Sequence, residues 1–322
     1  MTITKQLFAA AAAIALTVPS SAASLQSSPS FAWGEELPDG PFASKRQKDT
    51  LAAQILLARL NHSPGVIDGF PGGNTARAIS TFEEMQGLSA DGKVDEDMLA
   101  ALKSAAGDAP LLKTYTITSD DIGDGFTKPA QGMKAQAQTG NVGYGSASEM
   151  LAEKFGMSER FLKKLNPNTD FTAGSSILVA NVDAGPIGDV ARIEVDGSNN
   201  ELRVYDDGGA LLASFPATVG SAEFPSPSGT REVSAIAPAA SYYFDPSDQD
   251  WGGDEKLTIP AGPNNPIGGV WIDLGSDGYG IHGSPDPAKI GKTASHGCVR
   301  LTNFDVRRLL DAVEQGVTVE FV

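Results

Sequence analysis

The chain gathers its few reactive side chains in one stretch, IHGSPDPAKIGKTASHGCVRL, residues 281–301. Two of its three histidines, His282 and His296, and its only cysteine, Cys298, lie there. A thiol beside an imidazole is the minimal machinery for covalent acyl transfer, because the imidazole can take the proton of a thiol whose ordinary pKa is about 8.5. The stretch therefore predicts a cysteine nucleophile with a histidine base.

Such an attack also requires donors for the developing oxyanion and an acceptor that orients the imidazole. Backbone amides around Gly297 and Cys298 can supply the donors, and a glycine permits a tight turn there. A backbone carbonyl after His282 can supply the acceptor. YGIHG and SHGCVRL are expected to be strand segments joined by a loop over residues 284–293, and an antiparallel return would bring His282 and Cys298 together.

Two other interpretations of these residues are available. Cys298 could be a buried apolar filler, although that leaves the two nearby histidines unexplained. His282, His296 and Cys298 could instead be ligands of a catalytic zinc. The spacing argues against a metal, because His296 and Cys298 are two positions apart at a strand entry and no carboxylate is placed to orient either imidazole. We therefore expect neither a metal nor another cofactor.

The overall charge restricts the partners. Forty acidic and 24 basic residues among 322 give a formal net charge of −16, which disfavours nucleic acid and anionic membrane surfaces. An anionic substrate would need a local cation, and Arg300 is the candidate. The alternative for Arg300 is an ordinary ion pair with an acidic side chain.

The N-terminus has the pattern of a secretory signal peptide over residues 1–23. One lysine precedes an apolar run from Leu7 to Val18, followed by Pro19 and small residues. That run is shorter than the roughly 20 residues a membrane-spanning helix needs, which disfavours an uncleaved anchor. We therefore expect an exported protein, in which Cys298 has no disulfide partner.

The rest of the chain predicts a multidomain α+β protein. Residues 24–44 are expected to be a flexible lead-in, and residues 45–105 a small three-helix module. In that module we expect Thr75 to cap the second helix and Gly87 to end it, and the third to begin at Asp95. His62 lies in a Pro-Gly loop and is expected to face solvent.

The next two segments have different patterns. Residues 112–183 predict the order β-α-α-β, and residues 187–322 predict a mostly β domain with the size of a sandwich or open barrel. REVSAIA and GVWIDL are among its expected strands. One late helix is expected to be capped by Thr302 and to end at Gly316.

Parts of the sequence resemble known modules. The IDG turn, the T-x-x-A-I-x-x-F helix and the G-L-x-x-D-G-x-V tail resemble a peptidoglycan-binding module. The run FGMSERFLKKLNP resembles a LysM module, here with a long insert, residues 120–148, between the first strand and the helices. For this second module, glycan binding and a spacer role both stay open.

The C-terminal segment is similar to the L,D-transpeptidase catalytic domain of the YkuD type, on the motifs HGS, SHGCVRL and KLTIPAGPNNPIGGVWIDL. The resemblance implies Cys298 as nucleophile and His282 as its general base. It further implies that the Gly283 carbonyl completes the triad, that His296 and Gly297 shape the oxyanion hole, that Ser295 braces the turn, and that Arg300 contacts substrate. Tyr242, Tyr243 and Trp251 are expected to combine lining of the substrate groove with core packing.

The activity implied is peptidoglycan cross-linking. Cys298 would attack the third-residue carbonyl of a stem tetrapeptide and expel D-alanine, and an amine on a second stem would resolve the thioester as a 3-3 cross-link. Stem peptides, and glycan strands through the accessory modules, would be the partners. Two alternatives stay open, namely a hydrolase with the same triad and a catalytically silent wall-binding protein.

Overall fold

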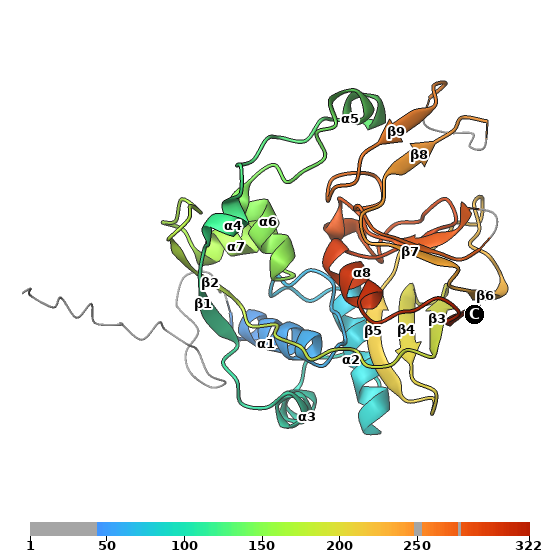
Figure 1. The fold of residues 1–322 in the computed structure, drawn as a ribbon. Coiled ribbons are helices and arrows are strands. Elements are labelled where there is room, and N and C mark those ends of the chain that lie inside the picture. Colours follow the sequence, from blue (N-terminus) through green and yellow to red (C-terminus); the bar gives the residue numbers. More distant parts are fainter. Residues whose placement is uncertain (1–43, 248–252, 276–277) are drawn as a thin grey trace, which may run out of the picture.

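The computed structural model describes residues 44–247, 253–275 and 278–322 (Figure 1). The predicted signal segment, the lead-in up to residue 43 and Trp251 lie outside the described residues. In the part that is described, no helix is both long and apolar enough to cross a membrane.

The predicted helical module is present. It consists of α1 (Lys45–Arg59), α2 (Gly73–Gln86) and α3 (Glu96–Ala106). Asp95 caps α3 by accepting from the Met98 amide at 2.9 Å, as predicted.

The boundaries of α2 confirm one prediction and correct another. Gly87 ends the helix in a left-handed conformation, with φ of 67°, as predicted. Gly72, and not Thr75, occupies the cap position. The buried Thr75 hydroxyl accepts instead from Gln54 Nε2 of α1 at 3.1 Å, so tertiary packing uses the side chain that we expected to cap the helix.

The second segment confirms the β-α-α-β order. Strands β1 (Leu112–Thr116) and β2 (Ser176–Ala180) pair antiparallel and flank α6 (Ala147–Lys154) and α7 (Glu159–Leu165). The insert is more ordered than a loop, because it contains two further short helices. These are α4 (Ser119–Ile122) and α5 (Met133–Thr139).

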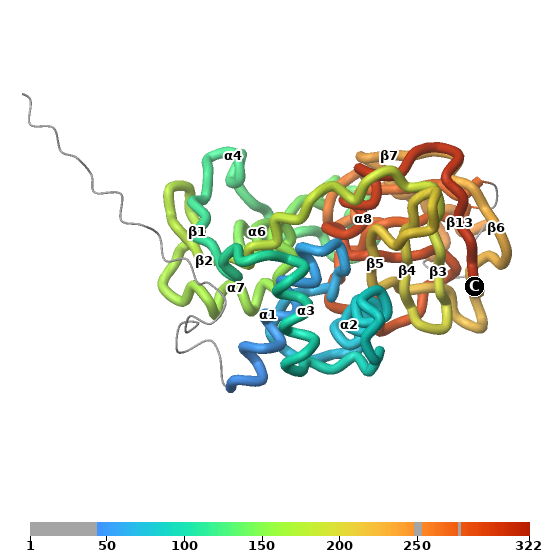
Figure 2. The backbone as a smooth tube through the Cα atoms, turned by 90° about the horizontal axis from the view of Figure 1, so that it is seen from below, coloured from blue at the N-terminus to red at the C-terminus, as the bar shows by residue number. Residues whose placement is uncertain are grey.

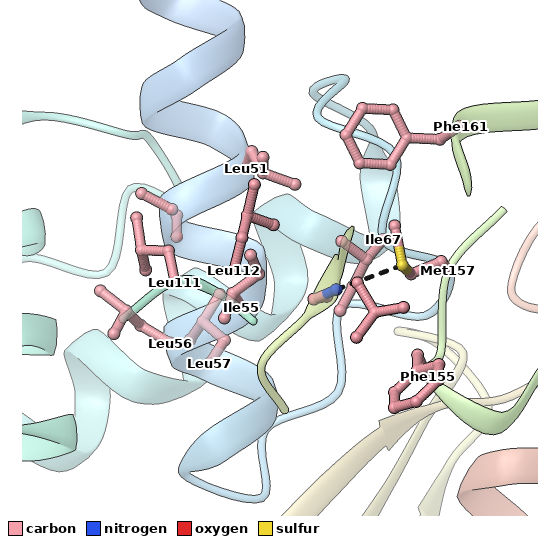
Figure 3. Close-up of a cluster of buried hydrophobic side chains, with 14 of the residues drawn as sticks. Leu51, Ile55, Leu56, Leu57, Ile67, Leu111, Leu112, Phe155, Met157 and Phe161 are labelled. Carbon is pink, nitrogen blue, oxygen red and sulfur yellow. Dashed lines mark hydrogen bonds between the residues drawn. The ribbon is translucent and has the colours of Figure 1, made fainter. Parts of the chain in front are cut away.

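These two segments share one hydrophobic core. Figure 3 shows Leu51 and Ile55 of α1 together with Leu112 of β1 and Met157 and Phe161 of the second segment. All five side chains are at most 3% exposed. Since neither segment encloses this core alone, we infer that they fold as one unit.

The C-terminal part contains two main sheets within the described residues. Their orders are β5-β4-β3-β13-β6 and β12-β11-β10-β7. The first sheet comprises β3 (Arg192–Asp196), β4 (Glu201–Tyr205), β5 (Leu211–Pro216), β6 (Gly229–Glu232) and β13 (Thr318–Phe321). The second comprises β7 (Ala235–Ala237), β10 (Trp271–Asp273), β11 (Gly280–His282) and β12 (Val299–Arg300). Side chains from both sheets form one core, as expected for a sandwich.

Details of this part differ from the sequence-based expectation. REVSAIA is divided between β6 and β7, which lie in different sheets. A hairpin of β8 (Tyr242–Phe244) and β9 (Leu257–Ile259) lies beside α5 of the insert (Figure 1). Helix α8 (Asn303–Leu310) is capped by Thr302, as predicted, but it ends before Gly316 in a short series of turns.

The helical module packs directly on the first sheet, where α2 lies against β5 (Figures 1 and 2). The expectation that His62 faces solvent is wrong, since its side chain is only 2% exposed. Its Nδ1 lies 3.0 Å from Ser214 Oγ of β5. The cause is that the chain at residues 61–63 runs beside β5, with the Ser63 amide donating to the Ser214 carbonyl at 2.8 Å.

The His62 environment predicts a pH dependence of stability. Burial, and secondarily the charge of Arg203, lowers the pKa of His62 from 6.5 to about 4. Between these pH values the unfolded chain binds a proton at His62 that the folded chain does not. The contribution of His62 to the free energy of unfolding is therefore fully present above pH 6.5 and is lost as the pH falls toward 4. Its full size is about 3 kcal/mol, at about 1.36 kcal/mol per pKa unit.

We therefore expect His62→Gln to have a smaller difference in unfolding free energy between pH 7 and pH 5 than the wild type. Urea denaturation at the two pH values measures this difference. Equal pH dependence in the two proteins would contradict the assignment.

Candidate active site

Two short parallel strands bring the predicted histidine and cysteine together. In the β11–β12 register, Ile281 is opposite Val299 and His282 is opposite Arg300. The antiparallel return that we expected is therefore wrong. The connection does not fold back as a hairpin but crosses over through a 3-10 turn, Pro287–Lys289, and β12 takes Thr218 as an antiparallel neighbour on its other side.

The register decides which side chains share a face. Ile281 and Val299 are at most 1% exposed and belong to the core between the sheets. Because neighbouring side chains in a strand alternate, His282 and Arg300 lie on the opposite face, and Cys298, one residue before β12, follows the same alternation. Parallel pairing thus places thiol, imidazole and guanidinium on one side of the sheet.

The His282 imidazole is buried and held in one tautomer. Its Nδ1 lies 2.7 Å from the Gly283 carbonyl oxygen, which can only accept, so the proton is assigned to Nδ1 and Nε2 is unprotonated. Burial, assisted by the charge of Arg300, lowers the pKa of His282 to about 3. The ring is therefore neutral at pH 7, which is the state a general base requires.

Trp271 of β10 is a site residue that the sequence did not single out. Its ring stacks on His282, with centroids 5.5 Å apart and planes 18° from parallel. Gly280 makes room for it, since a Cβ there would lie 2.4 Å from the indole. The sequence carries one signal of a large neighbouring side chain. In GIH, a glycine stands two residues before the histidine, so it lies on the same face of the strand and leaves space there.

The Cys298 thiol is half-buried and not ionised by its surroundings. Burial raises its pKa, while a hydrogen bond from the Gly280 backbone and the charge of Arg300 act in the opposite direction. Its Sγ donates to the Gly278 carbonyl at 3.7 Å, and within the described chain no hydrogen bond joins it to His282. The resting pair is therefore a neutral thiol beside a neutral imidazole.

A tight turn presents the thiol. Ser295 Oγ donates to the Cys298 carbonyl at 2.5 Å and accepts from the Gly297 amide at 3.1 Å. Gly297 has φ of 114°, in the region that favours glycine, and a Cβ there would lie 2.7 Å from the Tyr279 ring. The Gly297 amide thus already donates to Ser295 Oγ. Of the two predicted oxyanion donors, the Cys298 amide is therefore the one that has no acceptor in the described part of the chain.

The other predicted residues differ in position. His296 is exposed and packs against Phe224, with ring centroids 4.8 Å apart. Tyr242 is half-buried in β8. Arg300 is half-buried, forms no ion pair with the acidic side chains that the structure describes, and buries its Nε without an acceptor. The alternative of a simple ion pair for Arg300 is thus not observed among those residues.

A buried amide stands behind the histidine turn. Asn303, at the start of α8, accepts from the Ser284 amide at 2.9 Å. Its Nδ2 donates to Glu153 of α6 at 2.8 Å and to the Pro263 carbonyl at 3.1 Å. The sequence predicted a role only for the neighbouring Thr302, as a helix cap, and no local pattern indicated that Asn303 reaches back to residue 153.

A large cavity lies beside Glu153 and is lined by neither His282 nor Cys298. It has a volume of about 890 Å³ and lies where α6, α8 and the loop at residues 63–67 meet. Among residues 44–247, 253–275 and 278–322, no three His, Cys, Asp or Glu side chains form a group that could hold a metal ion.

Comparison with known proteins gives a match for each of two regions. Residues 190–321 match the family described as L,D-transpeptidase catalytic domain, YkuD. Residues 46–102 match the family described as "Putative peptidoglycan binding domain".

Individual relatives are named L,D-transpeptidases. "Putative L,D-transpeptidase YkuD" of Bacillus licheniformis is 28% identical over 178 residues, which cover 54% of this chain and 93% of that protein. "Probable L,D-transpeptidase YbiS" of Escherichia coli is 44% identical over 64 residues, 20% of this chain and 21% of the relative. The solved structure of an L,D-transpeptidase from Mycobacterium smegmatis aligns with 47% of this chain and 64% of its own, at 22% identity and a TM-score of 0.34.

The position of Arg300 predicts the reactivity of the thiol. Removing its positive charge disfavours the thiolate, so Arg300→Gln should raise the pKa of Cys298 further. We expect alkylation by iodoacetamide at pH 8 to slow about 3- to 10-fold. Arg300→Lys retains the charge and should react at nearly the wild-type rate, whereas equal slowing of both variants would show that the charge is not the cause.

The strained backbone at Gly297 leads to a prediction about the rate at which Cys298 is acylated. Gly297→Ala places a Cβ against Tyr279 at φ of 114°, so the thiol and its amide must shift. We expect acylation of Cys298 by a peptide donor, followed by mass spectrometry, to slow about 100-fold. Gly316→Ala is the matched control, because Gly316 has φ of 90° but a Cβ added there would meet no atom within 4 Å. Similar losses in both variants would contradict a role specific to the turn.

Proposed function

Since residues 190–321 are an L,D-transpeptidase catalytic domain, we propose that this protein cross-links peptidoglycan through a thioester on Cys298. The observation that supports this best is the shared face of β11 and β12. It combines a buried neutral imidazole, fixed by the Gly283 carbonyl, with a cysteine presented on a turn. The match of residues 46–102 to a peptidoglycan-binding domain supports the same substrate.

The first half-reaction forms the thioester. The Cys298 thiol leaves its acceptor, the Gly278 carbonyl, and transfers its proton to Nε2 of His282 as the sulfur attacks the third-residue carbonyl of the donor stem. The Cys298 amide donates to the oxyanion. The carbon–nitrogen bond to D-alanine then breaks, and the imidazolium returns the proton to the leaving amine.

Charge separation is confined to the transition state in this scheme. Burial disfavours both the thiolate and the imidazolium in the free enzyme. Arg300 stabilises the thiolate and disfavours the imidazolium, so it favours return of the proton to the leaving group. We assign Arg300 a further role in holding a stem carboxylate, consistent with its lack of an acidic partner in the described residues.

The second half-reaction transfers the acyl group. The amine of a second stem attacks the thioester and passes its proton to His282. The carbon–sulfur bond breaks, and the thiolate recovers a proton from the imidazolium. The product is a 3-3 cross-link, and the enzyme returns to its neutral resting state.

The location follows from the substrate. An enzyme of this family acts at the cell wall, which agrees with the predicted signal peptide over residues 1–23. We propose that the mature chain works in the periplasm, with residues 44–183 attached directly to the catalytic domain.

The decisive test is the product formed from purified tetrapeptide muropeptides. We expect the wild type to give dimers with release of D-alanine, detected by mass spectrometry, and Cys298→Ala and His282→Ala to give none. His296→Ala tests whether the nearer histidine in sequence is the base, and it should retain dimer formation.

Other outcomes of this test would contradict the proposal. Tripeptide monomers without dimers would identify a hydrolase with the same residues. Unchanged muropeptides with the wild type would identify a protein that binds the wall without catalysis. Dimer formation by Cys298→Ala would exclude the thioester.

A further inference from the structure

We propose that Glu153, which lies outside the catalytic domain, is a positioning residue for the His282 base and acts through Asn303 and the Gly283–Ser284 peptide. The inference rests on the proposed acyl transfer, in which His282 takes the thiol proton. It assigns the second segment, residues 112–183, a part in the active site that glycan binding or spacing does not require.

The first link is a single peptide unit. The Gly283 carbonyl and the Ser284 amide belong to the same rigid plane. Its oxygen accepts from His282 Nδ1 at 2.7 Å, and its N–H donates to Asn303 Oδ1 at 2.9 Å. The plane therefore cannot rotate away from the histidine without also breaking the bond to Asn303. The two bonds also polarise the peptide in the same sense, which strengthens the acceptor.

The second link is the fixed orientation of the Asn303 amide. A Cβ at Gly268 would lie 1.9 Å from its Oδ1, and one at Gly283 would lie 2.3 Å away, so two glycines create the space that it fills. Its oxygen faces a donor, and its nitrogen faces two acceptors, Glu153 Oε2 and the Pro263 carbonyl. A flipped amide would oppose like groups at all three contacts.

The third link is the carboxylate itself. Glu153 accepts from Asn303 at 2.8 Å and from the Tyr144 hydroxyl at 2.5 Å, so each of its oxygens has a donor. Burial raises the pKa of Glu153, which shows that holding a charge here is costly. A group that only filled space between α6 and α8 would not need to be an acid. Because the carboxylate can only accept, the NH2 group of Asn303 must face Glu153, which orients the Asn303 oxygen toward the Ser284 amide.

The support for Glu153 comes from the insert and from α6. Tyr144 belongs to the insert, and Glu149, one turn before Glu153, accepts from Asn264 Nδ2 at 2.6 Å. Asn264 also donates to the Gly143 carbonyl at 2.9 Å. The insert and α6 thus make a second contact with the catalytic domain, at the loop between β9 and β10, beside the bond of Glu153 to Asn303.

The experiment compares Glu153→Ala, Glu153→Gln and Glu149→Gln in the full-length protein, with kcat and KM measured for D-alanine release from tetrapeptide. We expect Glu153→Ala to lower kcat about 10- to 100-fold with KM changed less than about 3-fold, because a misplaced base slows the step without weakening substrate binding. Glu153→Gln keeps an acceptor for Asn303 and should restore kcat to within about 3-fold of the wild type. Glu149→Gln, which alters a neighbouring contact with the same domain, should leave kcat unchanged.

Each remaining outcome has one meaning. Unchanged kcat in Glu153→Ala, with His282→Ala inactive, would overturn the positioning role and leave the proposed function intact. A wild type without D-alanine release would instead refute the function. Equal losses in Glu153→Ala and Glu149→Gln, or a loss confined to KM, would show that Glu153 only joins the segments. If Glu153→Ala fails to fold by circular dichroism, the His282 Nδ1 proton resonance in Glu153→Leu decides, since leucine fills the space without an acceptor for Asn303: the resonance should shift or broaden, and an unchanged resonance would overturn the role.

Discussion

The parallel pairing of β11 with β12 is the constraint on which the site depends. Ile281 and Val299 are buried in the core between the sheets. Because side chains alternate along a strand, their neighbours His282 and Cys298 both lie on the opposite face. The long connection, residues 283–297, is what permits parallel pairing, and its two ends hold the functional turns. One end carries the carbonyl that orients the imidazole, and the other carries the Ser295 bonds that shape the thiol turn.

Desolvation then determines the chemistry of this face. Trp271 stacks on His282, the Ser226 hydroxyl donates to the Gly297 carbonyl beside Cys298, and burial disfavours the charged form of both reactive side chains. The pKa of the imidazole falls and that of the thiol rises. In the free enzyme a neutral, unreactive thiol therefore lies beside a neutral imidazole that can accept its proton. A neutral resting thiol is also less readily oxidised, because oxidation begins at the thiolate.

The accessory segments are part of the same body as the catalytic domain. Leu51 of α1 and Phe161 of α7 belong to one core, and His62 is buried against β5. Hydrogen bonds cross the junctions, including the buried bond of Ser63 with Asp305 and the partly buried bond of Asn303 with Glu153. Such polar contacts contribute little net stability but fix geometry, which is the property a catalytic turn needs from its surroundings.

The sequence by itself predicted the chemistry proposed here and determined most of the elements. The spacing of His282, Cys298 and their glycines indicated acyl transfer, and local rules placed the caps at Asp95 and Thr302, because capping depends on residues within one turn. It did not determine whether β12 pairs parallel or antiparallel, whether His62 is buried, or which hydrogen bonds Thr75 and Asn303 form. Those side chains depend on Ser214, Gln54 and Glu153, which lie 21 to 152 positions away, and no local pattern encodes such contacts. Only the tertiary structure brought a glutamate from another segment to Asn303, which binds the turn after His282, the proposed base.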